Sequence, residues 1–214
     1  KGRAVRTYGT SIYFTPDPTI FSNIDFNIQS ILEQAESKAF LNKGLKIVVS
    51  SISEKKEFQY LNGIQDYIEK IIGKRSTLSD TPFYIEKDDK KMRFETAFQW
   101  TSGTETIVHS YANAIKTVDG GSHETGFRNG ITKALRSYIE RRKLLPKGIN
   151  NITGDDVREG LIAIINVYLQ GDVEFQGQTK GRLNSDITSQ VESVVKHSLE
   201  HHLLENQTKG DSIA

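Results

Sequence analysis

The sequence contains no cysteine, only four prolines and no apolar run that approaches the roughly 20 residues of a membrane-spanning helix. Without cysteine the chain can form no disulfide, no thiolate metal site and no cysteine nucleophile, and this composition fits a reducing compartment. Residues 1–6 lack the apolar core of a signal peptide. We therefore expect a cytoplasmic location and no membrane partner.

An excess of charge of either sign is also missing, because 28 basic and 27 acidic residues leave a net charge of +1. Global attraction to nucleic acid is thereby excluded, so any such contact must come from a local basic face. The 214 residues suffice for one well-buried domain, with or without a long appended helix. The chain opens on Lys1 without an initiator methionine, and we expect it to be a fragment of a longer polypeptide.

Apolar periodicity predicts a mixture of strands and helices in the first half of the chain. Asp25 is the expected cap of the first helix, and Gly44 stands where a helix end favours glycine. The expected elements are a strand over 9–14, a helix over 25–44, a hairpin of 45–51 and 57–61 with its turn at 53–56, a helix over 64–72, and strands over 83–86, 92–100 and 106–111. The last three strands suggest a largely antiparallel meander.

Two long helices and one strand are expected in the second half. Residues 161–167 are apolar on both faces and predict a central strand, which follows a short helix capped near Thr153. The buried helix stripes should be Phe127, Ile131, Leu135, Tyr138 and Ile139, and then Ile187, Val191, Val194, Val195, Leu199 and Leu203. The expected fold class is α+β, a two-layer sandwich with helices on one side of a mostly antiparallel sheet and a long C-terminal helix.

The loop between that strand and the last helix combines groups that suit a phosphate. Gly177 permits a tight turn, Gln178 and Thr179 offer hydrogen-bonding groups, and Lys180 adds a compact positive charge. One interpretation is a phosphate sensor. The other is an ordinary surface loop, because glycine followed by polar residues is typical of both.

The long helix also carries basic residues on the side away from its buried stripe. Arg128, Lys133, Arg136, Arg141 and Arg142 could contact nucleic-acid phosphates without reading sequence. The alternative is a solvated helix face.

Three further patterns have both a functional and a structural interpretation. His197, Glu200 and His201 match the H-x-x-E-H zinc-peptidase pattern, but we expect an exposed helix face instead, because the buried stripe of that helix needs Leu199. Residues 119–121 could form a phosphate-binding glycine loop, but no Walker lysine follows, so we expect a tight turn into a helix. The acids at 155–159 could bind a divalent ion or simply cap a helix. We expect no metal site.

Five segments in order resemble the transducer domain of the ATPase subunit of bacterial type IIA topoisomerases, the DNA gyrase B and topoisomerase IV B type. The segments are 9–10, 40–44, 119–123 together with 126–128, 153–161, and 177–180. The resemblance implies a fold like ribosomal protein S5 domain 2. It also implies one transducer domain over 1–214, divisible into a body at 1–184 and a helix at 185–214. The upstream GHKL ATPase domain and the downstream cleavage domain would be absent from this chain.

The resemblance also implies residue roles. Gln178 and Lys180 would contact the γ-phosphate of ATP, and Gly177 and Thr179 would shape their loop. Arg128 would face a DNA cavity, with Lys133 and Arg136 as further candidates. No catalytic residue is expected in this chain, because ATP and Mg²⁺ would be bound mainly by the ATPase domain.

The implied function is to couple ATP binding and hydrolysis to DNA-gate motion during strand passage. The implied partners are double-stranded DNA bound without sequence preference, the topoisomerase A subunit, and a second B subunit when ATP is bound, in the bacterial nucleoid. The parent would be an ATP-hydrolysing type II topoisomerase, gyrase or topoisomerase IV, and the fragment alone would be inactive. Two alternatives stay open: a stand-alone S5-like module that binds RNA or the ribosome, and a zinc peptidase.

Overall fold

The computed structural model describes residues 9–52, 54–145, 148–149 and 151–214. The chain start at 1–6, Ser53 in the expected turn and part of the loop near 146 therefore lie outside the described residues. Among the described residues, no helix is both long and apolar enough to cross a membrane.

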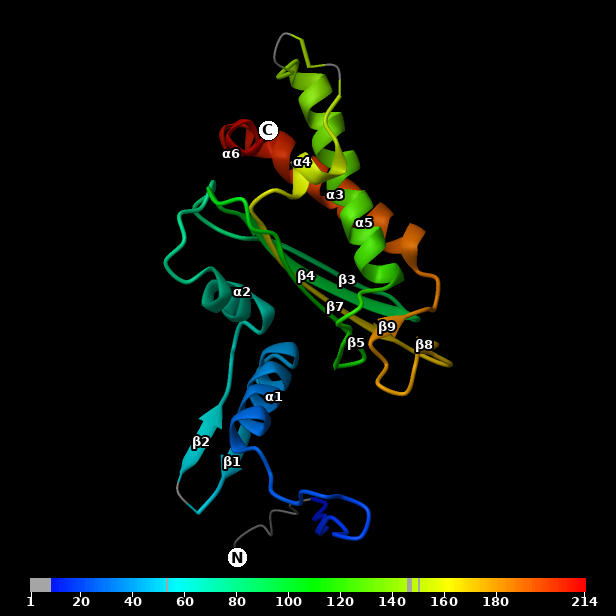
Figure 1. Cartoon of the computed structure of the whole chain (residues 1–214). Helices are drawn as coiled ribbons and strands as arrows, with labels where there is room; N and C mark the ends of the chain where they lie inside the picture. The colour runs from blue at the N-terminus through cyan, green and yellow to red at the C-terminus, as the bar shows by residue number, and fades with distance from the viewer. Residues whose placement is uncertain (1–8, 53, 146–147, 150) are drawn as a thin grey trace, which may run out of the picture.

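A five-stranded mixed sheet forms the centre of the molecule, with the order β3-β4-β7-β5-β6 (Figure 1). Its strands are β3 Phe83–Asp88, β4 Met92–Trp100, β5 Ile107–Ala112, β6 Ile115–Lys116 and β7 Leu161–Leu169. The central position of β7 confirms the prediction made from its apolar run. Such a strand is most stable where neighbours cover both its edges and both its faces.

The expected antiparallel meander is wrong beyond its first hairpin. β3 pairs with β4 as predicted, but β7 lies between β4 and β5, antiparallel to β4 and parallel to β5. β4 and β5 are consecutive in sequence and do not pair in this sheet. The sequence between them gives no sign of this insertion, because the inserted strand comes some 50 residues later in the chain.

One face of the sheet is covered by α3 Ser122–Arg142 and α5 Thr188–Glu205, with the short helices α4 Gly154–Arg158 and α6 Gln207–Ile213 beside them (Figure 1). Phe98 of β4 meets Phe127 of α3 edge to face, with ring centroids 5.3 Å apart. The predicted helix stripes are buried, apart from the partly exposed Val194. This layer and the sheet bear out the α+β class with its long C-terminal helix.

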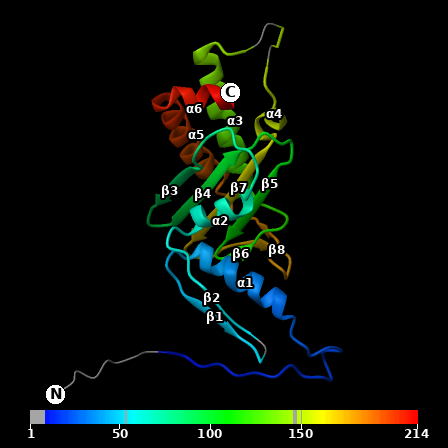
Figure 2. The same ribbon diagram turned by 90° about the vertical axis from the view of Figure 1, so that its left-hand side faces the viewer.

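Two helices occupy the other face of the sheet, so the expectation that all helices cover one side is wrong. α2 Ile64–Ile72 lies over this face, and α1 Ile28–Leu41 lies beside it, next to the hairpin β1 Ile47–Ser50 and β2 Lys55–Phe58 (Figure 2). The Tyr67 hydroxyl of α2 bonds to the Tyr111 hydroxyl of β5 at 3.1 Å. A second helix layer explains why nearly all of β4 is buried, including side chains that point away from α3.

The expected strand at 9–14 is also wrong, because residues 9–27 contain no helix or strand. Ile12, Tyr13 and Phe14 are exposed and pair with no strand in the described chain. The first helix starts later than expected: Asn27, not Asp25, caps it by accepting a 3.0 Å hydrogen bond from the backbone N–H of Ser30.

Candidate functional site

The loop predicted to sense phosphate is the turn of a small hairpin formed by β8 Phe175–Gln176 and β9 Arg182–Leu183. Its four turn residues, 177–180, are all exposed. Gly177 has φ +73° and Lys180 has φ +55°, so the turn is closed by two left-handed residues, with Lys180 N–H donating to the Gly177 carbonyl at 3.3 Å. A lysine in this backbone region is uncommon, and such strained positions cluster at functional sites.

The ammonium group of Lys180 is placed by an aromatic ring. Its Nζ lies 5.6 Å from the ring centroid of Phe175, within the range of a cation–π contact. No ion pair joins it to a carboxylate anywhere in the described ranges. The positive charge is therefore free to attract an anion from outside the chain.

The base of this hairpin is joined to the glycine turn at 119–121. The Asp119 N–H donates to the Gly181 carbonyl at 2.9 Å, and the Leu183 N–H donates to the Gly120 carbonyl at 3.1 Å. Gly121 has φ +144°, and a Cβ there would lie 2.5 Å from the Leu183 carbonyl oxygen. Only glycine permits this approach, so two motifs some 60 residues apart form one structural unit (Figure 1).

The glycine turn leads directly into α3, as the structural interpretation of residues 119–121 predicted. His123 in the first turn of α3 is fully buried, and its Nε2 lies 3.1 Å from the Thr117 hydroxyl. Burial lowers the pKa of His123 to about 4, so its imidazole is neutral near pH 7.

The three basic candidates for DNA contact lie on α3, but the structure gives each a partner within the chain. Arg128 pairs with Glu124 at 2.6 Å, and Lys133 pairs with Glu192 of α5. The Arg136 Nε donates to the Ile152 carbonyl at 2.7 Å. Each of the three candidates therefore already has a partner within the described part of the chain.

Arg128 does line a surface hollow of about 490 Å³. The hollow also contains Arg158 and the hydroxyl-bearing Thr104 and Thr106, together with acidic residues of α4 and the turn after it. Sequence reasoning did not single out Arg158. Its place within the segment 153–161 was the only signal, because the approach of α4 to the start of α3 is a tertiary contact.

The residues of the remaining sequence patterns have structural roles. Thr153 and Asp156 form a reciprocal capping box at the start of α4, and hydrogen bonds from Thr153 hold the pKa of Asp156 below its ordinary value. His197 Nδ1 bonds to the Ser193 carbonyl at 2.7 Å, and His201 pairs with Glu205 at 3.2 Å. The described residues hold no group of three or more His, Cys, Asp or Glu side chains placed to bind a metal.

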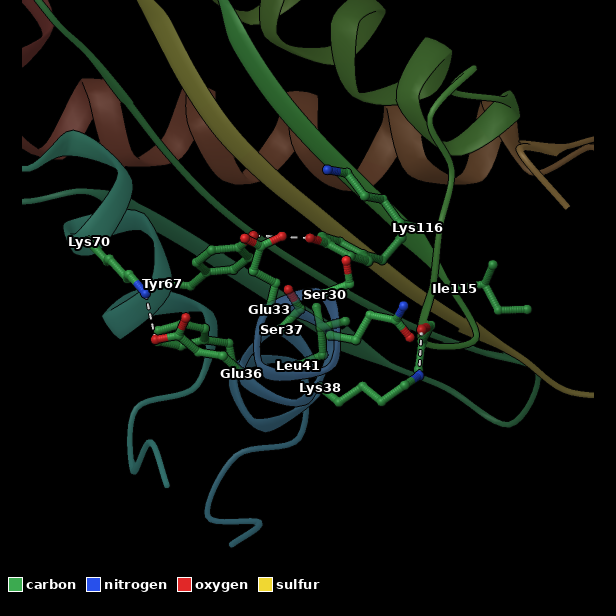
Figure 3. A pocket seen from close by; sticks show the side chains of 14 residues that line it. Ser30, Glu33, Glu36, Ser37, Lys38, Leu41, Tyr67, Lys70, Ile115 and Lys116 are labelled. Carbon is green, nitrogen blue, oxygen red and sulfur yellow. Dashed lines mark hydrogen bonds and ion pairs between the residues drawn. The ribbon is translucent and has the colours of Figure 1, made fainter. Parts of the chain in front are cut away.

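A larger cavity, of about 720 Å³, lies where α1 meets α2 and the β5–β6 hairpin (Figure 3). Glu36 of α1 pairs with Lys70 of α2 at 2.5 Å, and the Lys38 ammonium donates to the Ala114 carbonyl at 3.3 Å. These contacts join α1 to the rest of the chain. Sequence reasoning did not find this cavity, because its walls come from three segments far apart in the chain.

Comparison with known proteins gives consistent matches. The DNA gyrase B family matches residues 63–214. The DNA gyrase B subunit of Streptococcus pyogenes serotype M3 is 36% identical over 204 residues, which cover 92% of this chain and 31% of that protein. The chain thus spans about a third of the length of the curated relatives it matches.

Two solved structures share the fold at similar coverage. The 43K ATPase domain of Thermus thermophilus gyrase B, in complex with an aminocoumarin, has a TM-score of 0.78 and 30% identity. The topoisomerase IV ATP-binding domain of Francisella tularensis, in complex with a small-molecule inhibitor, has a TM-score of 0.79 and 31% identity. Each match covers 92% of this chain and 54% of the other.

Proposed function

Because the chain belongs to the DNA gyrase B family, we propose that it is the transducer part of the B subunit of a type II DNA topoisomerase. In this role it couples ATP binding and hydrolysis to DNA-gate motion during strand passage. The observation that carries the proposal is the exposed turn at 177–180, where Lys180 presents an ammonium group with no carboxylate partner in the described part of the chain.

The turn suits the terminal phosphate of a nucleotide. Lys180 supplies charge, Gln178 supplies an amide donor beside it, and Gly177 and Thr179 complete the tight turn that presents both. ATP with Mg²⁺, held mainly by the rest of the longer protein, would supply the anionic phosphate. Lys180 would bind that phosphate, and its loss on hydrolysis would release the turn.

Backbone hydrogen bonds connect the turn at 177–180 to the rest of the domain. The hairpin base is hydrogen-bonded to Gly120 and to Asp119, immediately before α3, and α3 packs along α5. A displacement of the hairpin therefore moves the start of the helix that carries Arg128. A hairpin that the phosphate holds and that hydrolysis releases would be a two-state element of the kind that nucleotide switches use.

The partners follow from the same proposal. Arg128, Lys133 and Arg136 would contact double-stranded DNA through phosphates, without sequence preference. The complete B subunit would assemble with the A subunit and would dimerise when ATP is bound. Without the nucleotide-binding residues of the longer protein, this chain alone would hydrolyse no ATP.

The test is Lys180→Ala in the complete B subunit, assayed for ATP hydrolysis with the A subunit and DNA. We expect turnover to fall at least about tenfold, because an ammonium bound to a developing phosphate charge contributes several kcal/mol. Lys74→Ala is the matched control, since Lys74 is an exposed lysine at the opposite end of the sheet. Equal rates for the two variants would reject the sensor role.

A further inference from the structure

The carboxylate of Glu124 contacts Arg128 and also lies against the glycine turn that holds the base of the β8–β9 hairpin. Its Oε1 accepts hydrogen bonds from Arg128 Nε at 3.0 Å and from Arg128 Nη2 at 2.6 Å. Its Oε2 accepts a hydrogen bond from the Ser110 hydroxyl of β5 at 2.9 Å. Both oxygens are thus used, and they join α3 to the sheet.

This pair differs from an ordinary ion pair on a helix surface. The Glu124 side chain is only 17% exposed and that of Arg128 is 34% exposed. Partial burial strengthens a charge-assisted hydrogen bond and reduces its screening by salt. Two of the guanidinium nitrogens are committed to Glu124, which leaves Nη1 as the nitrogen without a hydrogen bond to this carboxylate. Glu124 therefore sets both the direction and the free donors of Arg128.

The same carboxylate rests on the glycine turn. A Cβ at Gly120 would lie 3.0 Å from Glu124 Oε2, so the carboxylate packs closely against the Gly120 backbone. The Gly120 carbonyl accepts the hydrogen bond from Leu183 at the base of the sensing hairpin. A shift of that hairpin changes the surface against which Glu124 is held.

A buried hydroxyl network fixes the other side of Glu124. The Ser110 hydroxyl, which donates to Oε2, also lies 2.8 Å from the Thr117 hydroxyl, and Thr117 in turn bonds to the buried His123. Ser110, Thr117 and His123 are all buried. Such a network allows few alternative positions for the carboxylate, so a displacement of Gly120 is transmitted to Arg128 rather than absorbed.

We infer that Glu124 is a positioning residue that links the phosphate-sensing turn to the DNA-contacting guanidinium of Arg128. The inference rests on the proposed function and adds a regulatory step to it. The nucleotide state determines, through Gly120 and Glu124, how Arg128 is presented to a phosphate of the DNA duplex.

The experiment is a double-mutant cycle in the complete B subunit, assembled with the A subunit. Glu124→Gln, Arg128→Gln and the double variant are assayed for ATP hydrolysis with and without linear duplex DNA, and the readout is the ratio of the two rates. We expect Glu124→Gln to lower this ratio about fivefold or more, the lower end of typical coupling between sites. The double variant should be no lower than the worse single variant, because both changes interrupt one pathway.

Glu192→Gln is the matched control. It removes the carboxylate that pairs with Lys133 on the same helix, but Glu192 lies on α5 and makes no hydrogen bond to the glycine turn. We expect its ratio to change less than about twofold, because the Lys133 side chain is 54% exposed and this pair lies away from the glycine turn. Equal effects of Glu124→Gln and Glu192→Gln, or additive effects within the cycle, would overturn the inference.

Thermal denaturation of each variant distinguishes a folding defect from a loss of coupling. If Glu124→Gln does not fold, Ser110→Ala replaces it, because this change removes only the hydroxyl that holds Oε2; an unchanged ratio in Ser110→Ala then counts against the inference. A normal rate in Lys180→Ala would reject the proposed function as a whole. A low rate in Lys180→Ala together with an inert Glu124→Gln would reject the positioning role alone.

Discussion

At the scale of single residues, polar side chains around the start of α3 are buried and held by hydrogen bonds. His123 is 0% exposed; its Nε2 bonds to the Thr117 hydroxyl, while its Nδ1 has no partner within the described chain. An imidazole in this position is neutral, since a buried charge without a counter-charge in contact is costly. The residue is part of the core that supports Glu124.

The burial of His123 predicts a dependence of stability on pH. The pKa is about 4 in the folded chain and about 6.5 when the histidine is exposed, so between these values only the unfolded chain binds the proton. The free energy of unfolding should fall by up to about 3 kcal/mol as pH decreases from about 7 to about 4. Urea denaturation at a series of pH values measures this.

The matched variants are His123→Gln and His201→Gln. The first should flatten the pH dependence between about 4 and about 6.5. The second controls for the substitution itself, because His201 is exposed on α5 and lies outside this buried network. If the free energy of unfolding of His123→Gln depends on pH as steeply as that of the wild type, other groups cause the effect.

At the scale of elements, α3 and α5 approach each other through two glycines. A Cβ at Gly126 would lie 2.5 Å from the Thr188 carbonyl oxygen, and one at Gly130 would lie 2.8 Å from Val195 Cβ. The glycines bring the two helix backbones together over the stripe that begins with Phe127. The periodicity of the sequence predicted the stripe but not the closeness of the helices.

This packing predicts that Gly130→Ala destabilises the protein. In an exposed helix the same change stabilises by about 1 kcal/mol, but here the added methyl group must displace α5, and we expect a loss of about 1–3 kcal/mol. Gly9→Ala is the control, because nothing lies within 4 Å of its added Cβ. Thermal denaturation measures the stability of each variant. A Gly130→Ala variant as stable as the wild type would show that the helices separate easily.

At the scale of the whole molecule, the net charge of +1 and the paired state of the α3 cations limit DNA binding. We expect weak binding that is independent of sequence. With three candidate phosphate contacts, the slope of log affinity against log salt should be no steeper than about −3. Between about 50 and 200 mM salt the affinity should then fall by no more than about 40-fold.

Fluorescence anisotropy of two labelled duplexes of unrelated sequence measures this for the chain itself. Arg128→Gln should make the slope shallower by about one contact, and Lys74→Gln should not change it. A tenfold preference for one duplex would contradict backbone recognition.

The local features of this protein follow from its sequence alone. The helix stripes of α3 and α5, the hairpin β3–β4, the buried strand β7 and the tight turn at 177–180 were all predicted, because periodicity, glycine placement and turn residues act over a few neighbouring residues. The five ordered segments likewise indicate the family, because each is a short contiguous motif whose residues can be read without knowledge of the fold.

Only the tertiary structure decided how these pieces meet. The position of β7 between β4 and β5, the second helix layer formed by α1 and α2, and the junction of Gly120 with Leu183 all depend on contacts between residues far apart in the chain. Such contacts are selected by the burial and hydrogen bonding of the complete fold, which no short stretch of sequence specifies. The residues from 9 to 14 alternate like a strand yet form none, because a strand needs a partner edge and the described chain supplies none there.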